Sequence, residues 1–164
     1  MSNDLRQGPG QVDVVDVRGP RFVAWVTTAV LIATLLLASV SSLAAAVVLG
    51  VQTVVFAFGA WRGPRRHPYG RVFAAVLAPR LGPVTEREPV PPLKFAQLVG
   101  FAFGLVGTVG FAVGAPLLGL VATAFGLFAA FLNAAFGICL GCQLYPFVAR
   151  LRQTDSHITS PITN

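Results

Sequence analysis

The amino-acid sequence predicts an all-α membrane protein with four transmembrane helices, arranged as two hairpins, and a short cytoplasmic interfacial helix. Three observations lead to this fold class. Only 11% of the 164 residues are charged and 55% are hydrophobic, whereas soluble domains average about 25% charged residues. Four long apolar runs contain no Asp, Glu, Lys or Arg. The basic residues all lie outside these runs.

Each apolar run is long enough to cross a bilayer, which takes about 20 residues. The runs are expected to be helical because lipid offers no hydrogen bonds to an open backbone. Ser39, Ser41 and Ser42 separate the first two runs, and Gly114–Pro116 separates the last two, so that each pair forms a hairpin. The expected spans are 22–40, 43–61, 95–113 and 117–145.

The positions of the positive charges predict the topology. The 12 Lys and Arg residues lie before the first span, in the 62–94 connection or after the last span, and the two short turns have none. Because cytoplasmic segments retain Lys and Arg, the tails 1–20 and 151–164 and the connection are expected to be cytoplasmic. They flank a transmembrane domain of residues 21–150, and the expected location is the plasma membrane.

The same charge distribution bears on binding partners. The net charge of +6 is divided among segments that flank the spans, where basic residues meet lipid headgroups. It does not form the single basic face of a nucleic-acid-binding protein. The lipid bilayer is therefore the expected partner, and no nucleic-acid role is expected.

The 62–94 connection is expected to contain one helix, between Pro68 and Pro79. An apolar stripe at helical spacing is formed by Tyr69, Val72, Phe73, Val76 and Leu77. This pattern predicts a helix lying on the cytoplasmic interface; the alternative is a loop whose aromatic residues pack on the bundle. The proline-rich stretch 81–92 is expected to be an extended strap, with docking of a partner as the alternative.

Small and polar residues within the runs predict how the helices pack. Glycines spaced by four in the third run let helix backbones approach closely in lipid. Asn133 needs a hydrogen-bond partner at its depth, and Gln52 and Gln97 are the candidates. Two hairpins of the same orientation also leave open an internal duplication.

Cys139 and Cys142 are the candidate catalytic residues. The C-x-x-C spacing places both sulfurs on one face of a helix, where they can form a disulfide or exchange electrons or sulfur with a partner. Within a 117–145 helix they lie near the C-terminus, where the helix dipole disfavours a thiolate. The reducing cytosol predicts a dithiol at rest.

Two alternatives for the cysteines stay open. They are structural residues packed in a helix, or they form half of a zinc site whose other half is missing. His67 is a lone imidazole in a basic loop. Neither a metal nor a cofactor is expected.

Several segments together resemble a known family. They are Val17–Phe22, Pro68–Gly70, Leu77–Pro83, Pro92–Gln97 and Phe131–Cys142. The most specific is the string Asn-Ala-Ala-Phe-Gly-x-Cys-x-Gly-Cys, which ends at Cys142. The chain resembles an uncharacterised actinobacterial membrane family known only as a domain of unknown function. The resemblance implies a cytoplasmic thioredoxin-like or rhodanese-like partner, because such proteins are often encoded near the family.

The sequence thus supports two main functional hypotheses. The first is a thiol-redox or sulfur-relay protein that uses Cys139 and Cys142 at the cytoplasmic membrane face. The alternative is a non-enzymatic membrane scaffold or interaction protein with structural cysteines. A transporter of a small sulfur species is a third hypothesis, although the apolar runs lack the charges and breaks that transporters usually show.

Overall fold

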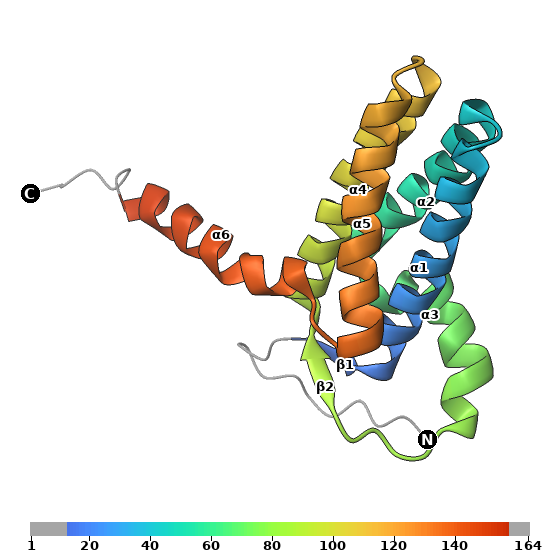
Figure 1. Ribbon diagram of the computed structural model, residues 1–164. Helices are drawn as coiled ribbons and strands as arrows, with labels where there is room; N and C mark the ends of the chain where they lie inside the picture. Colours follow the sequence, from blue (N-terminus) through green and yellow to red (C-terminus); the bar gives the residue numbers. More distant parts are fainter. Residues whose placement is uncertain (1–12, 158–164) are drawn as a thin grey trace, which may run out of the picture.

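Four long helices form the body of the protein, as Figure 1 shows. The computed structural model describes residues 13–157, with side chains to residue 150. All four helices are long and apolar enough to cross a membrane, which identifies a helical membrane protein. The helices are α1 (Arg18–Ala38), α2 (Ser42–Arg62), α4 (Val90–Ala112) and α5 (Pro116–Phe136).

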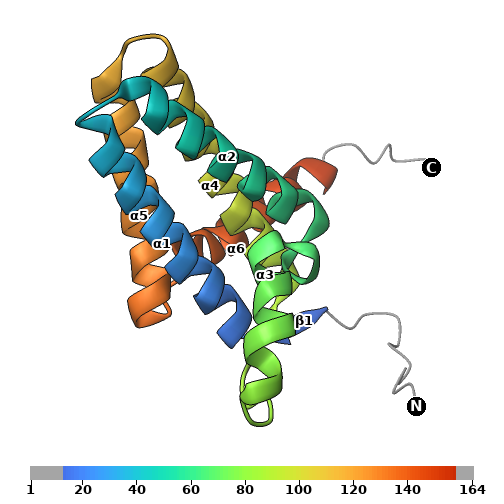
Figure 2. The same cartoon turned by 90° about the vertical axis from the view of Figure 1, so that its right-hand side faces the viewer.

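The helices pack as a ring in the order α1, α2, α4, α5. The most extensive contacts join α2 to α4, followed by α1 to α5 and α4 to α5. The α1–α2 and α4–α5 connections lie at the same end of the bundle (Figure 2). Near that end a compact core is centred on Leu31, Leu49 and Phe111, each no more than 2% exposed.

Glycines set the close approach of α4 to its neighbours. A Cβ added at Gly110 would lie 2.7 Å from the backbone nitrogen of Gly119 in α5. One added at Gly107 would lie 2.7 Å from the side chain of Leu49 in α2. The glycine pattern in the third apolar run therefore marks helix interfaces, as the sequence predicted.

The connection between α2 and α4 is mostly helical. It consists of η1 (Pro64–Arg66), α3 (Pro68–Val72), a π-helical turn η2 (Phe73–Leu77) and η3 (Ala78–Arg80). Phe73 is buried, and its ring centroid lies 5.8 Å from that of Phe22 in α1. Val72 and Val76 are exposed. The segment therefore forms the predicted helix and also packs an aromatic side chain on the bundle.

Two short strands tie distant parts of the chain together, which the all-α prediction did not include. Strand β1 (Val14–Asp16) pairs antiparallel with β2 (Arg87–Pro89), and Val15 lies opposite Glu88. The extended strap predicted for 81–92 ends earlier than expected, because α4 begins at Val90. Pro91 and Pro92 lie in the first turn of α4, where a missing N–H removes no intrahelical hydrogen bond.

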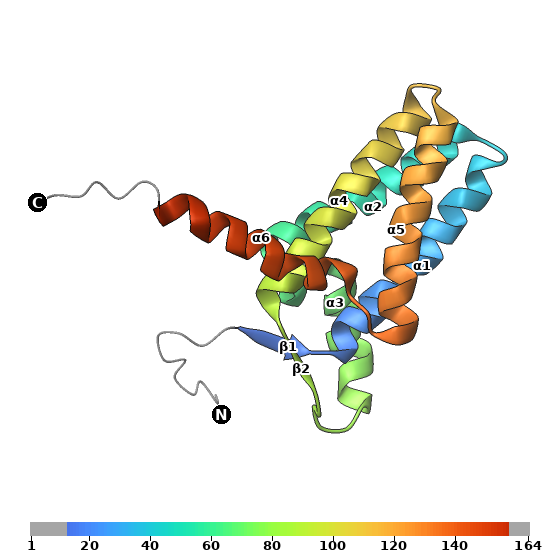
Figure 3. The ribbon, with the colours of Figure 1, turned by 60° about the vertical axis from the view of Figure 1, so that its left-hand side comes forward.

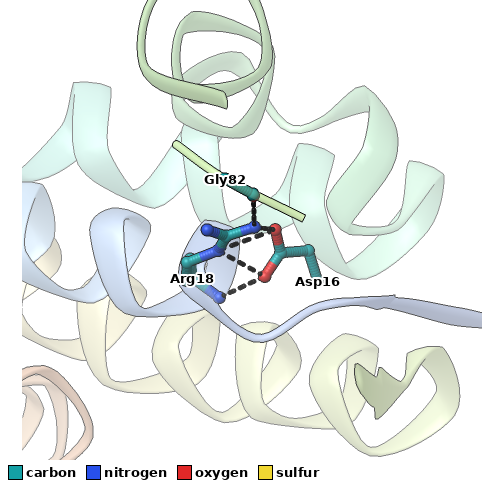
Figure 4. A network of polar contacts seen from close by, with 3 residues as sticks. All are labelled: Asp16, Arg18 and Gly82. Carbon is teal, nitrogen blue, oxygen red and sulfur yellow. Dashed lines mark hydrogen bonds and ion pairs between the residues drawn. The ribbon is translucent and has the colours of Figure 1, made fainter. Parts of the chain in front are cut away.

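Arg18 joins the start of α1 to the central connection (Figure 4). Its Nε donates to the two carboxylate oxygens of Asp16 at 3.1 and 3.0 Å, and its Nη2 donates to the carbonyl oxygen of Gly82 at 3.1 Å. Arg65 forms a second ion pair, with Asp13, at 2.7 Å. These contacts all lie at the end of the bundle opposite the two short connections.

The fourth apolar run is not one helix, which corrects the 117–145 prediction. Helix α5 ends at Phe136, and Gly137 adopts a left-handed conformation with φ 69°. The N–H groups of Gly137 and Ile138 donate to the carbonyls of Asn133 and Leu132. This Schellman arrangement terminates a helix. A separate helix, α6 (Leu140–His157), then leaves the bundle across the long axes of the other helices (Figure 3).

Candidate functional site

The two cysteines lie at the junction between α5 and α6. The sulfurs of Cys139 and Cys142 are at disulfide distance, and their Cα atoms are 5.2 Å apart. Both side chains are partly buried. The dithiol expected at rest stays a prediction, and the geometry places the two sulfurs where a disulfide can form.

The helix break reverses the expected electrostatics of this pair. Cys139 immediately precedes α6, and its carbonyl accepts a hydrogen bond from the N–H of Gln143. Its sulfur accepts one from the N–H of Cys142 at 3.3 Å. Cys139 therefore occupies the N-cap position of α6 rather than the C-terminal end of a long helix. A helix N-terminus stabilises a thiolate, so the sequence-based argument against an activated thiol was wrong.

A recess in the protein exposes the pair. It has a volume of about 310 Å³ and is lined by both cysteines together with Glu88, Gln143 and Gly137 among others. Burial raises the pKa of the Glu88 carboxyl, and the positive charge of Arg21 acts in the opposite direction. Glu88 therefore brings a carboxyl group to the recess that both cysteines line. It comes from β2, outside the four apolar helices.

Cys139 also lines a larger cavity among the helices. Its volume is about 420 Å³, and residues of α1, α2, α4, α5 and α6 line it. Most of its wall is apolar. The wall reaches the outer surface at Phe125, Phe128 and Leu144, which are 59%, 58% and 52% exposed. Cys139 lines both the cavity and the recess, whereas Cys142 lines only the recess.

Buried polar side chains gather at one part of the cavity wall. His67 is 1% exposed, and both its ring nitrogens lack a hydrogen-bond partner among the described residues, as does Oε1 of Gln97. Both residues line the cavity, as does Asn133. Burial lowers the pKa of His67 to about 4, so its imidazole is neutral near pH 7.

The polar residues pair differently from the sequence-based expectation. Gln52 was a candidate partner of Asn133, but its Oε1 accepts a hydrogen bond from Tyr69 at 2.8 Å. Gln97 shares the cavity wall with Asn133. In the part of the chain that the structure describes, no group of three His, Cys, Asp or Glu side chains is placed to hold a metal ion.

Sequence reasoning located the cysteines but missed their surroundings. Glu88 reaches the recess from β2, whose strand pairing joins segments more than 70 residues apart. His67 was set aside as a lone histidine in a loop, although it is among the most buried polar residues. Its neighbours Pro64 and Pro68 mark turns, but no local pattern indicates that its ring enters the bundle.

Four apolar helices with a C-x-x-C pair at disulfide distance define a helical membrane protein with a candidate thiol site. The chain belongs to the family described as Domain of unknown function (DUF4395), whose model matches residues 15–150. No curated protein and no solved structure matches the chain.

Proposed function

We propose that this protein is a plasma-membrane thiol–disulfide exchange protein whose Cys139–Cys142 pair acts at the cytoplasmic face. The observation that carries the proposal is the position of the pair. The two sulfurs are at disulfide distance, at the N-terminus of α6, beside a recess that Glu88 also lines. The partner that fits this recess is a thioredoxin-like or rhodanese-like protein.

The proposed topology places the recess in the cytoplasm. Two antiparallel helix pairs, α1–α2 and α4–α5, cross the membrane as hairpins, and their short connections face outward. At the end of the bundle opposite these connections lie the described basic residues, among them Arg18 and Arg65, which form ion pairs there. Positive charge of this kind is retained on the cytoplasmic side. The helical segment 68–80 and both tails then lie on that side.

The exchange step follows from the geometry of the two sulfurs. A thiolate of the partner enters the recess and attacks the sulfur of Cys142, forming a mixed disulfide. The bond between Cys142 and Cys139 breaks, and its electron pair leaves on Cys139, where the α6 N-terminus stabilises the thiolate. A second partner thiol then attacks the mixed disulfide. It releases an oxidised partner and a Cys142 thiolate, which takes its proton from solvent.

Trapping with purified proteins tests this assignment. Each single-cysteine variant is activated as a mixed disulfide with an aromatic thiol and incubated with a reduced thioredoxin that retains one active-site cysteine, so that the thioredoxin thiolate attacks the sulfur of the variant. We expect Cys139→Ser, which retains Cys142 in the recess, to form the covalent complex much faster than Cys142→Ser. The double variant is the matched control and should form none. Equal, slow reaction of both variants would contradict the assignment of Cys142 as the attacked sulfur.

One observation favours the alternative of a scaffold with structural cysteines. Gly141, between the two cysteines, is buried, and a Cβ there would lie 2.6 Å from the Cα of Ala96 in α4. The residue between the cysteines therefore packs α6 closely against α4. If neither cysteine exchanges with a dithiol protein and both serine variants merely lower the unfolding temperature, the scaffold function is correct.

A further inference from the structure

We propose that the apolar cavity binds a membrane-soluble quinone and that the reduced Cys139–Cys142 pair delivers two electrons to it. This inference rests on the thiol exchange proposed above, because it names the final electron acceptor of the same site. Cys139 lines two different spaces. One is the recess that also exposes Cys142, and the other is an apolar cavity that reaches the lateral surface of the bundle.

The position of the cavity selects a lipid-soluble ligand. Phe125 and Phe128 line it and are also exposed on the flank of α5. That flank faces lipid if α5 crosses the membrane. A ligand can therefore enter sideways from the bilayer without passing through water. The volume of about 420 Å³ falls within the ~300–1,000 Å³ range of small-molecule sites.

The chemistry of the wall selects a flat ring with carbonyl groups. Phe103 and Phe125 stack at the cavity with ring centroids 6.1 Å apart and an interplanar angle of 21°, and aromatic faces of this kind accept a further ring by offset stacking. His67 and Gln97 bring buried polar atoms to the same wall, where the two side chains lie close to each other. A neutral imidazole N–H can donate to a quinone carbonyl, and the Gln97 oxygen can accept from a hydroquinone O–H. A lipid acyl chain would offer neither group a hydrogen bond.

The electron transfer balances with the quinone as the only oxidant. The Cys139 thiolate, which lines the cavity, adds to a ring carbon, and a C–S bond forms as one oxygen takes a proton. The Cys142 thiolate then attacks the sulfur of Cys139. The S–S bond forms, and the C–S bond breaks with its electron pair left on the ring, where the second oxygen is protonated. Two thiols become one disulfide, and the quinone becomes a hydroquinone.

The test uses the purified full chain in lipid nanodiscs and a fully substituted short-chain benzoquinone. The protein is reduced with a dithiol, freed of reductant without oxygen, and mixed with the quinone, whose ultraviolet absorbance is followed. The parent should form one equivalent of hydroquinone and regain its disulfide. Two cavity-filling variants, Ala129→Trp and Gly126→Leu, should slow the reaction at least about tenfold, equivalent to ~1.4 kcal/mol.

The substitutions are chosen with the structure. Ala129 lines the cavity, and a Cβ at Gly126 would meet no atom closer than 3.6 Å, so that side chain has room to enter the space. Ala124→Trp is the matched control, because Ala124 lies on the exposed side of the same helix. It should reduce quinone at the parental rate. Retained exchange with thioredoxin shows that each cavity variant is folded.

The outcomes separate this inference from the function on which it rests. Exchange with thioredoxin but no quinone reduction by the parent would overturn the quinone site and leave the proposed function standing. Unchanged quinone reduction in both cavity-filling variants would also overturn it. Failure of thioredoxin exchange and quinone reduction together would refute both proposals. Quinone reduction without thioredoxin exchange would support the cavity and refute the proposed protein partner.

Discussion

His67 is expected to stay neutral far below the pH at which an ordinary histidine titrates. Its side chain is 1% exposed, and its ring makes an edge contact with Tyr69 at a centroid distance of 5.3 Å. A Cβ at Gly59 would lie 2.6 Å from the imidazole, so α2 also confines the ring. Burial lowers its pKa to about 4 because the charged form would lose its hydration, and nearby Gln97 acts in the opposite direction.

The lowered pKa of His67 makes the stability of the folded protein depend on pH. Between pH 6.5 and about 4 an unfolded chain protonates His67 while the folded chain does not. The unfolding free energy therefore has its full value above pH 6.5 and decreases as the pH falls towards 4, since the unfolded state binds a proton that the folded state does not. At ~1.4 kcal/mol for each pH unit, the loss from this group amounts to about 3 kcal/mol.

Proton titration by NMR measures this directly. The chain has two histidines, so His157→Gln leaves a single imidazole to observe in detergent micelles. We expect its resonances to hold their neutral positions down to about pH 5 and the unfolding free energy to decrease over the same range. The His67→Gln variant should lose this part of the pH dependence. A midpoint near 6.5 in the folded protein would show that the imidazole reaches water and would refute the reasoning.

Three further predictions concern stability and are measured by thermal unfolding in the same micelles. Gly110→Ala should destabilise the bundle by about 1–3 kcal/mol, because its Cβ would meet the backbone of the facing helix. The control Gly126→Ala should leave stability unchanged or raise it by up to ~1 kcal/mol. Equal effects of the two substitutions would contradict the close packing at Gly110. Gly137→Ala should cost about 1–2 kcal/mol, because φ is 69° there, and an unchanged midpoint would exclude the left-handed turn. The hydrogen bond from Arg18 lowers the pKa of Asp16. Asp16 therefore contributes stability that is present above its ordinary pKa and is lost as the pH falls through the lowered pKa. Asp16→Asn should lose about 1 kcal/mol or less of stability at neutral pH, and its stability should depend less on acid than that of the parent.

The apolar helices were predictable because a bilayer imposes one solution on a long uncharged run. What the sequence did not reveal was the break at Gly137. Glycines elsewhere in the same run, such as Gly119 and Gly126, sit inside α5 and provide packing surfaces. Nothing in the local composition distinguishes them from Gly137, which differs only in its positive φ. Helix termination there depends on capping hydrogen bonds that become visible only in the folded chain.

The candidate site was predictable only in part, for a related reason. The C-x-x-C spacing identifies Cys139 and Cys142, and their i, i+3 separation allows a disulfide on a helix or at its start. Whether the pair meets the positive or negative end of a helix dipole depends on where that helix begins, which was assigned wrongly. The recess and the cavity are assembled from segments far apart in sequence, including β2 and η1, and periodicity carries no information about such contacts.

The break at Gly137 explains why Cys139 lines two spaces. At one end of the bundle, α4 and α5 touch through Gly110 and Gly119, which leaves no room between them. At the other end α5 stops, and α6 takes its place against α4 with Gly141 packed on Ala96. Had α5 continued to residue 145, its own side chains would extend along the flank where the cavity now reaches the surface. The Schellman turn thus creates the N-terminus that stabilises a Cys139 thiolate and leaves room for the cavity beside it. A substitution that restores a continuous helix should therefore remove both features together.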